Sequence, residues 1–463
     1  MMAGPLLLIL LPLASAPIVF LLRRWTPLAA LLASATALAM AGLCLGPPLN
    51  RPISVLGWQV ALGQPVTVLG REFALGVANS LALGFLWLIA AIAFLFAWRI
   101  PQGSLFFALG LVILSLLGAA VMIRHFVFAV LFLWVADLVI VFLVQGEQEG
   151  LRQGALRYLV MVSLAVPPLL TALWLIDLHA VNPDNPALLR QAVVLLGIGF
   201  AILLAVVPFH GWVSALATDA PPIVTAFVLT AINTVVILLM LNLLQSYSWL
   251  SEDPQVFRLL RLGGGSMAVV GGGLALVQRS FGRLLGYAVL SDMGCTLMAL
   301  GIASPAGLTA ALLHVAHRSL GLLLAAMGLA TVRHQVGGDS FGSLSGVARR
   351  LPIASAGLVL GGLSLAGMPL TAGFPSRWAI YRLLPGQELG LVMLLSGGAV
   401  ALAYLRGLGT LLGSSTQSQV KRESIVASLI IVGMIVLCLG LGIFPQWLLS
   451  AVQRVAGSFS FLK

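Results

Sequence analysis

The sequence predicts an all-α, polytopic membrane protein with about fourteen transmembrane helices. Three observations lead to this fold class. The chain has 463 residues, of which 60% are hydrophobic and only 8% are charged. Its mean hydropathy is +1.11. The apolar residues are gathered in runs of about 20, the length that crosses a hydrocarbon core of about 30 Å. Together these values exclude a soluble globular protein.

Each expected helix is an apolar run bounded by charged residues or prolines. The runs of the N-terminal half cover residues 5–22, 28–46, 77–97, 105–121, 126–145, 156–177 and 190–209. Those of the C-terminal half cover residues 222–244, 264–278, 284–302, 307–332, 352–372, 390–411 and 424–444. The triple glycines at 263–265 and 271–273 predict a close contact between helices, because glycine lets two backbones approach.

The connections between these runs are too short for a separate soluble domain, so we expect one membrane-embedded domain over residues 1–463. Its expected parts are three N-terminal spans in 1–100, a five-span repeat in 101–245, a second five-span repeat in 260–411, and a last span with a tail in 412–463. Two inverted five-helix repeats are a common plan of transporters.

The N-terminal run contains Ala14-Ser15-Ala16, which resembles a signal-peptidase site. No basic segment precedes it and the run continues to Leu22, so we expect a retained first helix. The three cysteines, Cys44, Cys295 and Cys438, lie inside apolar runs without the spacing of metal ligands or of a disulfide framework. We therefore expect no cofactor, metal or redox centre on this chain.

The net charge is +11, but no basic cluster exceeds two adjacent residues, which argues against binding to nucleic acid. Thirteen Lys and Arg residues fall on the side reached after odd-numbered spans and nine on the other side; Arg318, inside a span, and Arg377, which follows the Pro- and Gly-interrupted segment 364–376, belong to neither count. By the positive-inside rule we expect both termini on the non-cytoplasmic side, in a bacterial inner (plasma) membrane or a thylakoid membrane.

Several ionisable residues lie inside apolar runs, where each charge costs roughly 2.5–3.5 kcal/mol on insertion scales. Unless such groups pair or meet water, they are too costly to keep, so they predict a polar seam inside the protein. The residues are Asp137, Asp292, His314, His317, Arg318 and Arg377. The seam fits a proton pathway, whereas buried ion pairs that only fix helix packing are the alternative interpretation.

His314 and Arg318 are four residues apart and share one helix face, with His317 close to it. We expect Asp292 to have a basic partner, in the first place Arg318, because an unpaired buried carboxylate is neutralised. Metal binding by His314 and His317 lacks an apparent third ligand.

The stretch from Val206 to Pro222, VVPFHGWVSALATDAPP, interrupts two long apolar runs and contains His210 and Asp219. Proline removes a helix hydrogen bond, so we expect a broken helix near residues 203–210. Pro369 and the Gly373-Phe374-Pro375 sequence predict a second break near residues 366–377. Ion sites of transporters lie at such breaks, although an ordinary loop with a boundary histidine would look the same at the first break.

Three ordered motifs resemble the antiporter-like membrane subunits of respiratory complex I, a family that includes subunits of multi-subunit Na⁺/H⁺ antiporters and of membrane-bound hydrogenases. GFAILLAVVPFHGWVSALATDAPPIVTA at 199–226 resembles the family's Pro-Leu-His-Thr-Trp-Leu-Pro signature. GRLLGYAVLSDMG at 282–294 and LSLAGMPLTAGFPSRW at 363–378 resemble two further family segments. The resemblance runs from about residue 75 to 410 and implies the family fold of fourteen spans.

The chain departs from the family at several positions that the resemblance marks as ion-pathway residues. Leu203 stands where the family has a lysine in span 7, and Asn233-Thr234 where it has one in span 8. The acid of span 5 is matched by Asp137, the span 12 lysine or glutamate by Arg377, and the histidine-rich span by His314, His317 and Arg318. Because arginine stays protonated at working pH, it cannot carry protons as lysine does.

The resemblance implies an antiporter-like subunit of an NADH- or ferredoxin-quinone oxidoreductase complex, which moves protons or other ions while other subunits transfer electrons. Its partners would be other membrane subunits and the lipid bilayer. With Leu203 in place of lysine, we expect the first half-channel to be degenerate, or rebuilt around Asp137, His210 and Asp219. A non-conducting scaffold paralogue is the alternative, as is a subunit of an inorganic-carbon uptake or Na⁺/H⁺ antiporter assembly.

Overall fold

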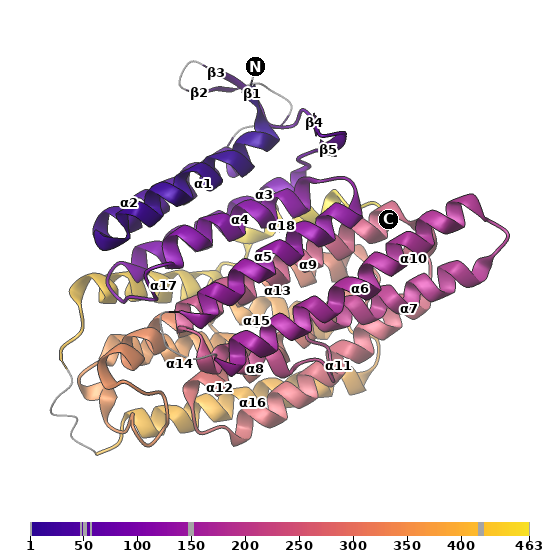
Figure 1. Ribbon diagram of the computed structural model, residues 1–463. Coiled ribbons are helices and arrows are strands. Elements are labelled where there is room, and N and C mark those ends of the chain that lie inside the picture. Colours follow the sequence, from indigo (N-terminus) through magenta and orange to yellow (C-terminus); the bar gives the residue numbers. More distant parts are fainter. Residues whose placement is uncertain are drawn as a thin grey trace.

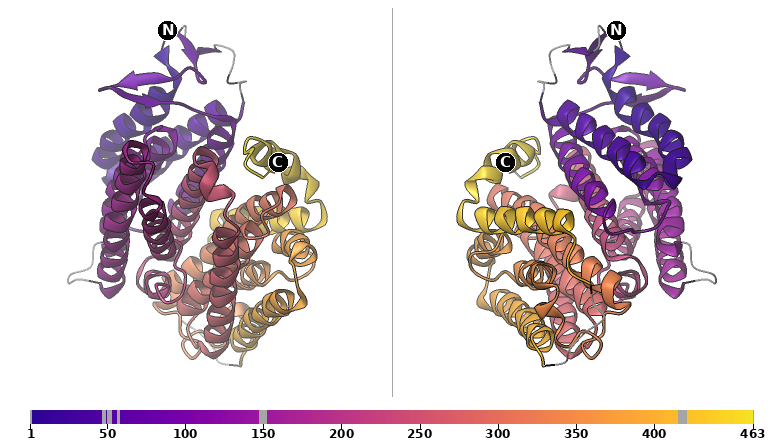
Figure 2. Two further views of the ribbon diagram at one scale, coloured as in Figure 1. Left: turned by 90° about the vertical axis from the view of Figure 1, so that its right-hand side faces the viewer. Right: turned by 90° about the vertical axis from the view of Figure 1, so that its left-hand side faces the viewer.

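The helices form a membrane-embedded bundle with the N-terminal pair at one edge. A computed structural model describes residues 2–46, 49, 53–55, 58–146, 152–414 and 421–462. The long helices lie side by side along roughly one direction, and the two halves of the chain form neighbouring groups (Figures 1 and 2). The helices of the N-terminal part are α1 (Gly4–Leu21), α2 (Thr26–Leu45), α3 (Val77–Ala97), α4 (Phe106–Met122), α5 (Phe126–Gln145) and α6 (Gln153–Val181).

The C-terminal part continues the same arrangement. After α7 (Pro186–Leu203), α8 (Gly211–Asp219), α9 (Pro222–Ser246) and the short α10 (Ser248–Ser251), the chain forms α11 (Pro254–Val277), α12 (Phe281–Leu300) and α13 (Pro305–Val336). It ends with α14 (Pro352–Ala366), α15 (Gly373–Leu383), α16 (Gln387–Leu411), α17 (Ile425–Ile443) and α18 (Gln446–Gly457). Two 3-10 turns, η1 (Leu22–Arg24) and η2 (Val347–Arg349), complete the helical elements.

Among the described residues, eleven helices are long and apolar enough to cross a membrane. Two further apolar helices, α4 and α14, are shorter. Every span expected from the sequence overlaps an observed helix, while the number of fourteen crossings stays a prediction. The most apolar stretches of α9 and α13 are buried along their whole length, so these two helices form the centre of the bundle.

The structure also contains short β-strands, most of them between α2 and α3, which the all-α prediction did not include. β2 (Ile53–Val55) pairs antiparallel with β3 (Trp58–Ala61), which also pairs with β1 (Met2–Ala3) at the start of the chain. β4 (Val66–Val68) and β5 (Arg71–Phe73) form a hairpin. Its two turn residues, Leu69 and Gly70, have φ of 49° and 74°, and this positive-φ pair makes the tight two-residue turn.

Both predicted helix breaks are present. α7 ends at Leu203, and α8 begins only at Gly211 after a segment that contains Pro208. α14 ends at Ala366, where Gly367 takes the left-handed conformation (φ 76°), and α15 begins at Gly373. Each break thus places a short helix, α8 or α15, next to the ionisable residues of the bundle.

The triple glycines provide the close contact predicted for them. A side chain at Gly264 would collide with the backbone at Gly294, and one at Gly271 with the backbone at Ser291. α11 and α12 therefore touch backbone to backbone on both sides of Asp292, which fixes the position of this residue in the bundle.

Candidate functional site

The best-connected polar group inside the bundle is the carboxylate of Asp292, on α12, which is 1% exposed. Its Oδ1 lies 3.1 Å from Nε2 of His314 on α13 and accepts a hydrogen bond of 3.2 Å from Nη2 of Arg377 on α15. The same Nη2 also donates to the carbonyl of Leu365 at 2.9 Å, near the end of α14. One guanidinium thus connects three helices at the second break.

The two histidines of α13 meet at one hydroxyl group. Nδ1 of His314 lies 3.0 Å from Oγ of Ser376, and Nδ1 of His317 lies 3.2 Å from the same oxygen. All three side chains are fully buried, at 0% exposure. Ser376 sits in the first turn of α15, directly before Arg377, so the break at 367–372 positions both residues against α13.

Arg318 has a different partner from the one predicted. Its Nη1 donates to Oγ1 of Thr296 at 3.1 Å, whereas the basic partners of Asp292 are His314 and Arg377. The sequence placed Arg318 on the same helix as His314, but Arg377 reaches Asp292 from α15, which only the fold brings beside α12. Arg318 stays a buried cation next to the Asp292 group, at 3% exposure.

A polar residue of the first half lies beside the helix that carries Asp292. The amide nitrogen of Asn233, on α9, lies 3.4 Å from the sulfur of Met293, the residue after Asp292. Its carbonyl oxygen is buried without a partner among the described residues. Position 233, where the resemblance leads us to expect a lysine, thus holds a neutral amide in contact with α12.

In the first half, Asp137 on α5 has a separate environment. Its Oδ1 accepts a hydrogen bond of 2.5 Å from the hydroxyl of Tyr158 on α6, whose ring packs edge-on against Trp212 of α8 at 5.4 Å between centroids. Leu203 is buried and lines a small cavity of about 20 Å³ between α5, α6, α7 and α9, where every lining residue is apolar. An apolar cavity of this kind stays dry.

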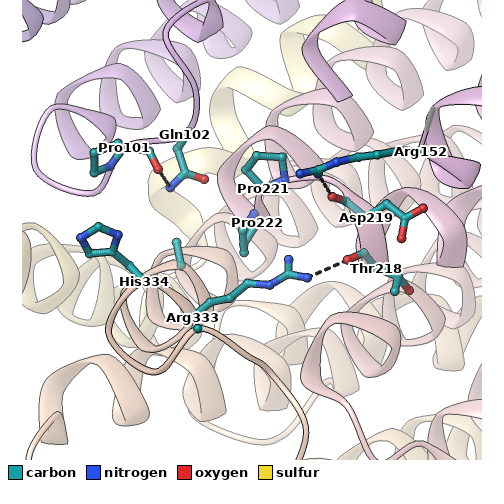
Figure 3. A pocket seen from close by; sticks show the side chains of 11 residues that line it. Pro101, Gln102, Arg152, Thr218, Asp219, Pro221, Pro222, Arg333 and His334 are labelled. Atoms are coloured by element: carbon teal, nitrogen blue, oxygen red, sulfur yellow. Dashed lines mark hydrogen bonds between the residues drawn. The ribbon is translucent and has the colours of Figure 1, made fainter. Parts of the chain in front are cut away.

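Asp219 belongs to a third group, a polar cavity of about 560 Å³ at the C-terminal end of α8. Figure 3 shows the guanidinium groups of Arg152 and Arg333 directed at this end of α8. Arg333 donates to the carbonyls of Thr218 (2.7 Å) and Ala220 (3.2 Å), and Arg152 donates to the carbonyl of Asp219. These bonds satisfy carbonyls that the end of a helix leaves without partners.

The electrostatics of this cavity are dominated by the two arginines. Burial lowers the pKa of Arg152, whereas the Asp219 carboxylate raises it and Arg333 lowers it further. The carboxylate of Asp219 accepts from the backbone amide of Gly154 at 2.6 Å, at the start of α6. Asp219 thus ties the start of α6 to the end of α8 and is remote from the histidine pair.

The structure therefore groups the predicted residues into separate sites. Asp292, His314, His317 and Arg377 come together, and Arg318 lies beside them. His210 precedes α8, and among the described residues its buried Nδ1 has no hydrogen-bond partner. Sequence reasoning missed Ser376 and Tyr158; a hydroxyl next to a charged residue in a helix break was the available signal for Ser376. Within the described chain, no cluster of three or more His, Cys, Asp or Glu side chains could hold a metal ion.

The fold and the buried site define the chain as an integral membrane protein with two broken helices, the second of which contributes Ser376 and Arg377 to a buried acid–base cluster. Residues 158–403 match the family described as NADH:quinone oxidoreductase/Mrp antiporter, transmembrane part. The chain belongs to this family, as the three sequence motifs indicate.

Two relatives give the range of the family. Over 307 residues the chain is 31% identical to NADH-quinone oxidoreductase subunit N of Geotalea uraniireducens, covering 65% of this chain and 63% of that protein. Over 350 residues it is 28% identical to formate hydrogenlyase subunit 3 of Escherichia coli, covering 67% of this chain and 56% of that protein. The chain thus spans less than two thirds of either relative.

Solved structures with the same fold come from three kinds of assembly. A chain of the archaeal membrane-bound sulfane sulfur reductase has a TM-score of 0.82 at 18% identity and covers 98% of this chain and 97% of its own. A chain of the Mrp complex from Dietzia sp. has 0.81 at 17%, covering 98% and 97%. A chain of respiratory complex I from Thermus thermophilus has 0.77 at 20%, covering 99% of both.

Proposed function

We propose that the chain is an antiporter-like membrane subunit that moves protons through its second half, within a complex whose other subunits transfer electrons. The observation that carries this proposal is the contact of one buried carboxylate, Asp292, with both an imidazole and a guanidinium. Ionisable groups inside a membrane protein mark ion pathways, and this carboxylate is buried in the protein interior.

The three groups have distinct roles in this proposal. Arg377 holds a permanent positive charge, which keeps the Asp292 carboxylate ionised next to it. His314 supplies an imidazole, a side chain that proteins use to carry protons, and a positive charge on it is stabilised by the carboxylate 3.1 Å away. Asp292 and Arg377 would thus remain an ion pair of fixed charge, while His314 binds and releases the proton.

The first half, in contrast, is proposed to be closed to protons. Leu203 occupies the position of the family lysine and faces only apolar side chains. His210 lies beyond the end of α7, across the break that separates it from Leu203, and it does not line the apolar cavity at Leu203. This feature also favours the second candidate function, a scaffold subunit that holds neighbours together and conducts no ions.

Assembly with other membrane subunits is part of the proposal, since the relatives named above belong to multi-subunit enzymes. The test is purification of the tagged chain from its own membrane in mild detergent, followed by mass spectrometry. We expect several further membrane subunits and at least one redox protein. Recovery of a lone chain that exchanges Na⁺ for H⁺ in liposomes would refute the subunit assignment.

Proton transfer is tested in inverted membrane vesicles by a fluorescent pH dye, as protons taken up per donor molecule oxidised. Asp292→Asn and His314→Ala should abolish uptake, whereas the exposed Asp184→Asn serves as a matched control. Assembly is checked by native gel in each case. Full uptake in both buried variants would leave the scaffold function as the better description.

A further inference from the structure

The hydrogen bonds around His314 fix the tautomer of this residue. Its Nε2 faces two acceptors, Oδ1 of Asp292 at 3.1 Å and the backbone carbonyl of Asp292 at 3.3 Å. Because neither oxygen carries a proton to donate, Nε2 must carry the N–H. In neutral His314 the other nitrogen, Nδ1, is therefore an acceptor, and the group 3.0 Å from it is the hydroxyl of Ser376.

This assignment sets the direction of the next bond. A serine hydroxyl has one proton, and when it is donated to Nδ1 of His314 the oxygen can only accept from its other neighbours. Nδ1 of His317 lies 3.2 Å from that oxygen, so this nitrogen must carry an N–H. The Nε2 of neutral His317 is then a bare lone pair, and it is buried with no partner among the described residues.

We propose that Ser376 is the proton relay between the two histidines and that the chain runs from His317 through Ser376 to His314. This inference rests on the proposed function and adds a residue and a direction to it. A proton that arrives at Nε2 of His317 makes an imidazolium. The Nδ1–H proton then moves to Oγ of Ser376 as the hydroxyl proton moves to Nδ1 of His314.

The step is balanced, because one N–H and one O–H bond break while one O–H and one N–H bond form. The hydroxyl is a neutral carrier, His317 returns to the neutral state with its proton on Nε2, and His314 becomes the imidazolium beside Asp292. No oxidant or further reactant is needed. The carboxylate of Asp292 favours the charge at the end of the chain.

The Ser376 hydroxyl has a second possible acceptor, and donating to it would interrupt the relay. Oγ of Ser376 also lies 3.2 Å from the backbone carbonyl of Gly373, on the same turn of α15. When the hydroxyl rotates to donate to this carbonyl, it no longer donates to His314 and the chain is broken. Movement of α15 relative to α13 would shift the hydroxyl between these two acceptors, so the break that starts α15 controls the contact.

The test replaces the hydroxyl alone. Ser376→Ala should lower proton uptake per donor oxidised by about tenfold to a hundredfold, in the lower range of what a positioned proton-transfer group contributes. Ser376→Thr retains a hydroxyl and should restore most of the uptake. Ser319→Ala is the matched control, because Ser319 is a buried hydroxyl on α13 whose bond within the described part of the chain goes to the carbonyl of Val315 at 2.7 Å. This control should match the parent complex.

The outcomes separate the relay from the wider proposal. Normal uptake in Ser376→Ala, together with loss in Asp292→Asn, overturns the relay and leaves the proposed function standing. Normal uptake in all of these variants overturns both. If Ser376→Ala fails to assemble, ¹⁵N NMR of the histidine-labelled parent complex decides. In the resting complex, before a proton enters, we expect Nδ1–H with a bare Nε2 on neutral His317, and the opposite tautomer in that state would refute the direction of the chain.

Discussion

At the scale of single residues, the cluster is defined by charges that only tertiary contacts can pair. Asp292 carries one negative charge, and Arg377 supplies the permanent positive charge beside it. Removing one member of a buried pair leaves an unpaired charge, which costs about 3–5 kcal/mol. Replacing both by apolar residues of similar size is often neutral. The pair can therefore be tested for stability separately from proton transfer.

Asp292→Leu alone is expected to lower the thermal stability of the detergent-solubilised complex strongly, because Arg377 loses its counter-charge. The double variant Asp292→Leu/Arg377→Met should regain most of the stability but none of the proton uptake. Differential scanning fluorimetry of the purified complex measures the first effect. If the double variant is as unstable as the single one, the pair does not account for the effect.

Unlike the Asp292 variants, Asp137→Asn should leave proton uptake nearly unchanged. Asp137 has Tyr158 as its partner, and Leu203 lines a cavity of apolar side chains only. We expect proton uptake by vesicles close to that of the parent, and an amide can still accept the bond from Tyr158. Strong loss of uptake with intact assembly would show that the first half conducts.

At the scale of helices, α13 takes part in two separate sets of contacts. Its centre carries His314 and His317, and its last turn carries Arg333, which binds the C-terminal carbonyls of α8. The 16 residues between His317 and Arg333 correspond to about 24 Å of helix. α13 thus connects the second-half cluster to the short helix at the first break.

Arg333→Leu removes two charge-assisted hydrogen bonds from the end of α8. We expect a local loss of about 1–3 kcal/mol and hence roughly 5- to 150-fold faster hydrogen exchange of the backbone amides of 211–220. Hydrogen–deuterium exchange with mass spectrometry measures this rate. The exposed Arg349→Leu is the control, and equal exchange in both variants would contradict the role of Arg333.

At the scale of the whole molecule, the charge distribution predicts orientation. Both termini should lie on the non-cytoplasmic side, because the odd-numbered loops carry more Lys and Arg. A reporter active only in the cytoplasm, fused to the C-terminus, should be inactive, whereas one fused within the segment 415–420 should be active. The reverse pattern would invert the topology and would place the cavity near Asp219 on the non-cytoplasmic side.

The fold class and both helix breaks could be predicted from the sequence, since apolar run length and proline position are local properties. The pairing of Asp292 could not, because Arg377 follows it by 85 residues and reaches it only through the second break. Ser376 was overlooked for the same reason: its neighbours on α13 are distant in the chain. Tyr158 likewise becomes the partner of Asp137 only when α5 and α6 pack together.

The length of α13 has a further consequence. Its 32 residues extend over about 48 Å, well beyond a hydrocarbon thickness of about 30 Å. A helix of this length can place Arg333 near the membrane surface, where it donates to the carbonyls at the end of α8, while the histidines near its middle lie in the apolar interior. A tilt of α13 near the histidines would therefore also displace its C-terminal end, which is bonded to α8. Through Arg333, the helix that carries both histidines is thus hydrogen-bonded to the half of the molecule in which Leu203 lies.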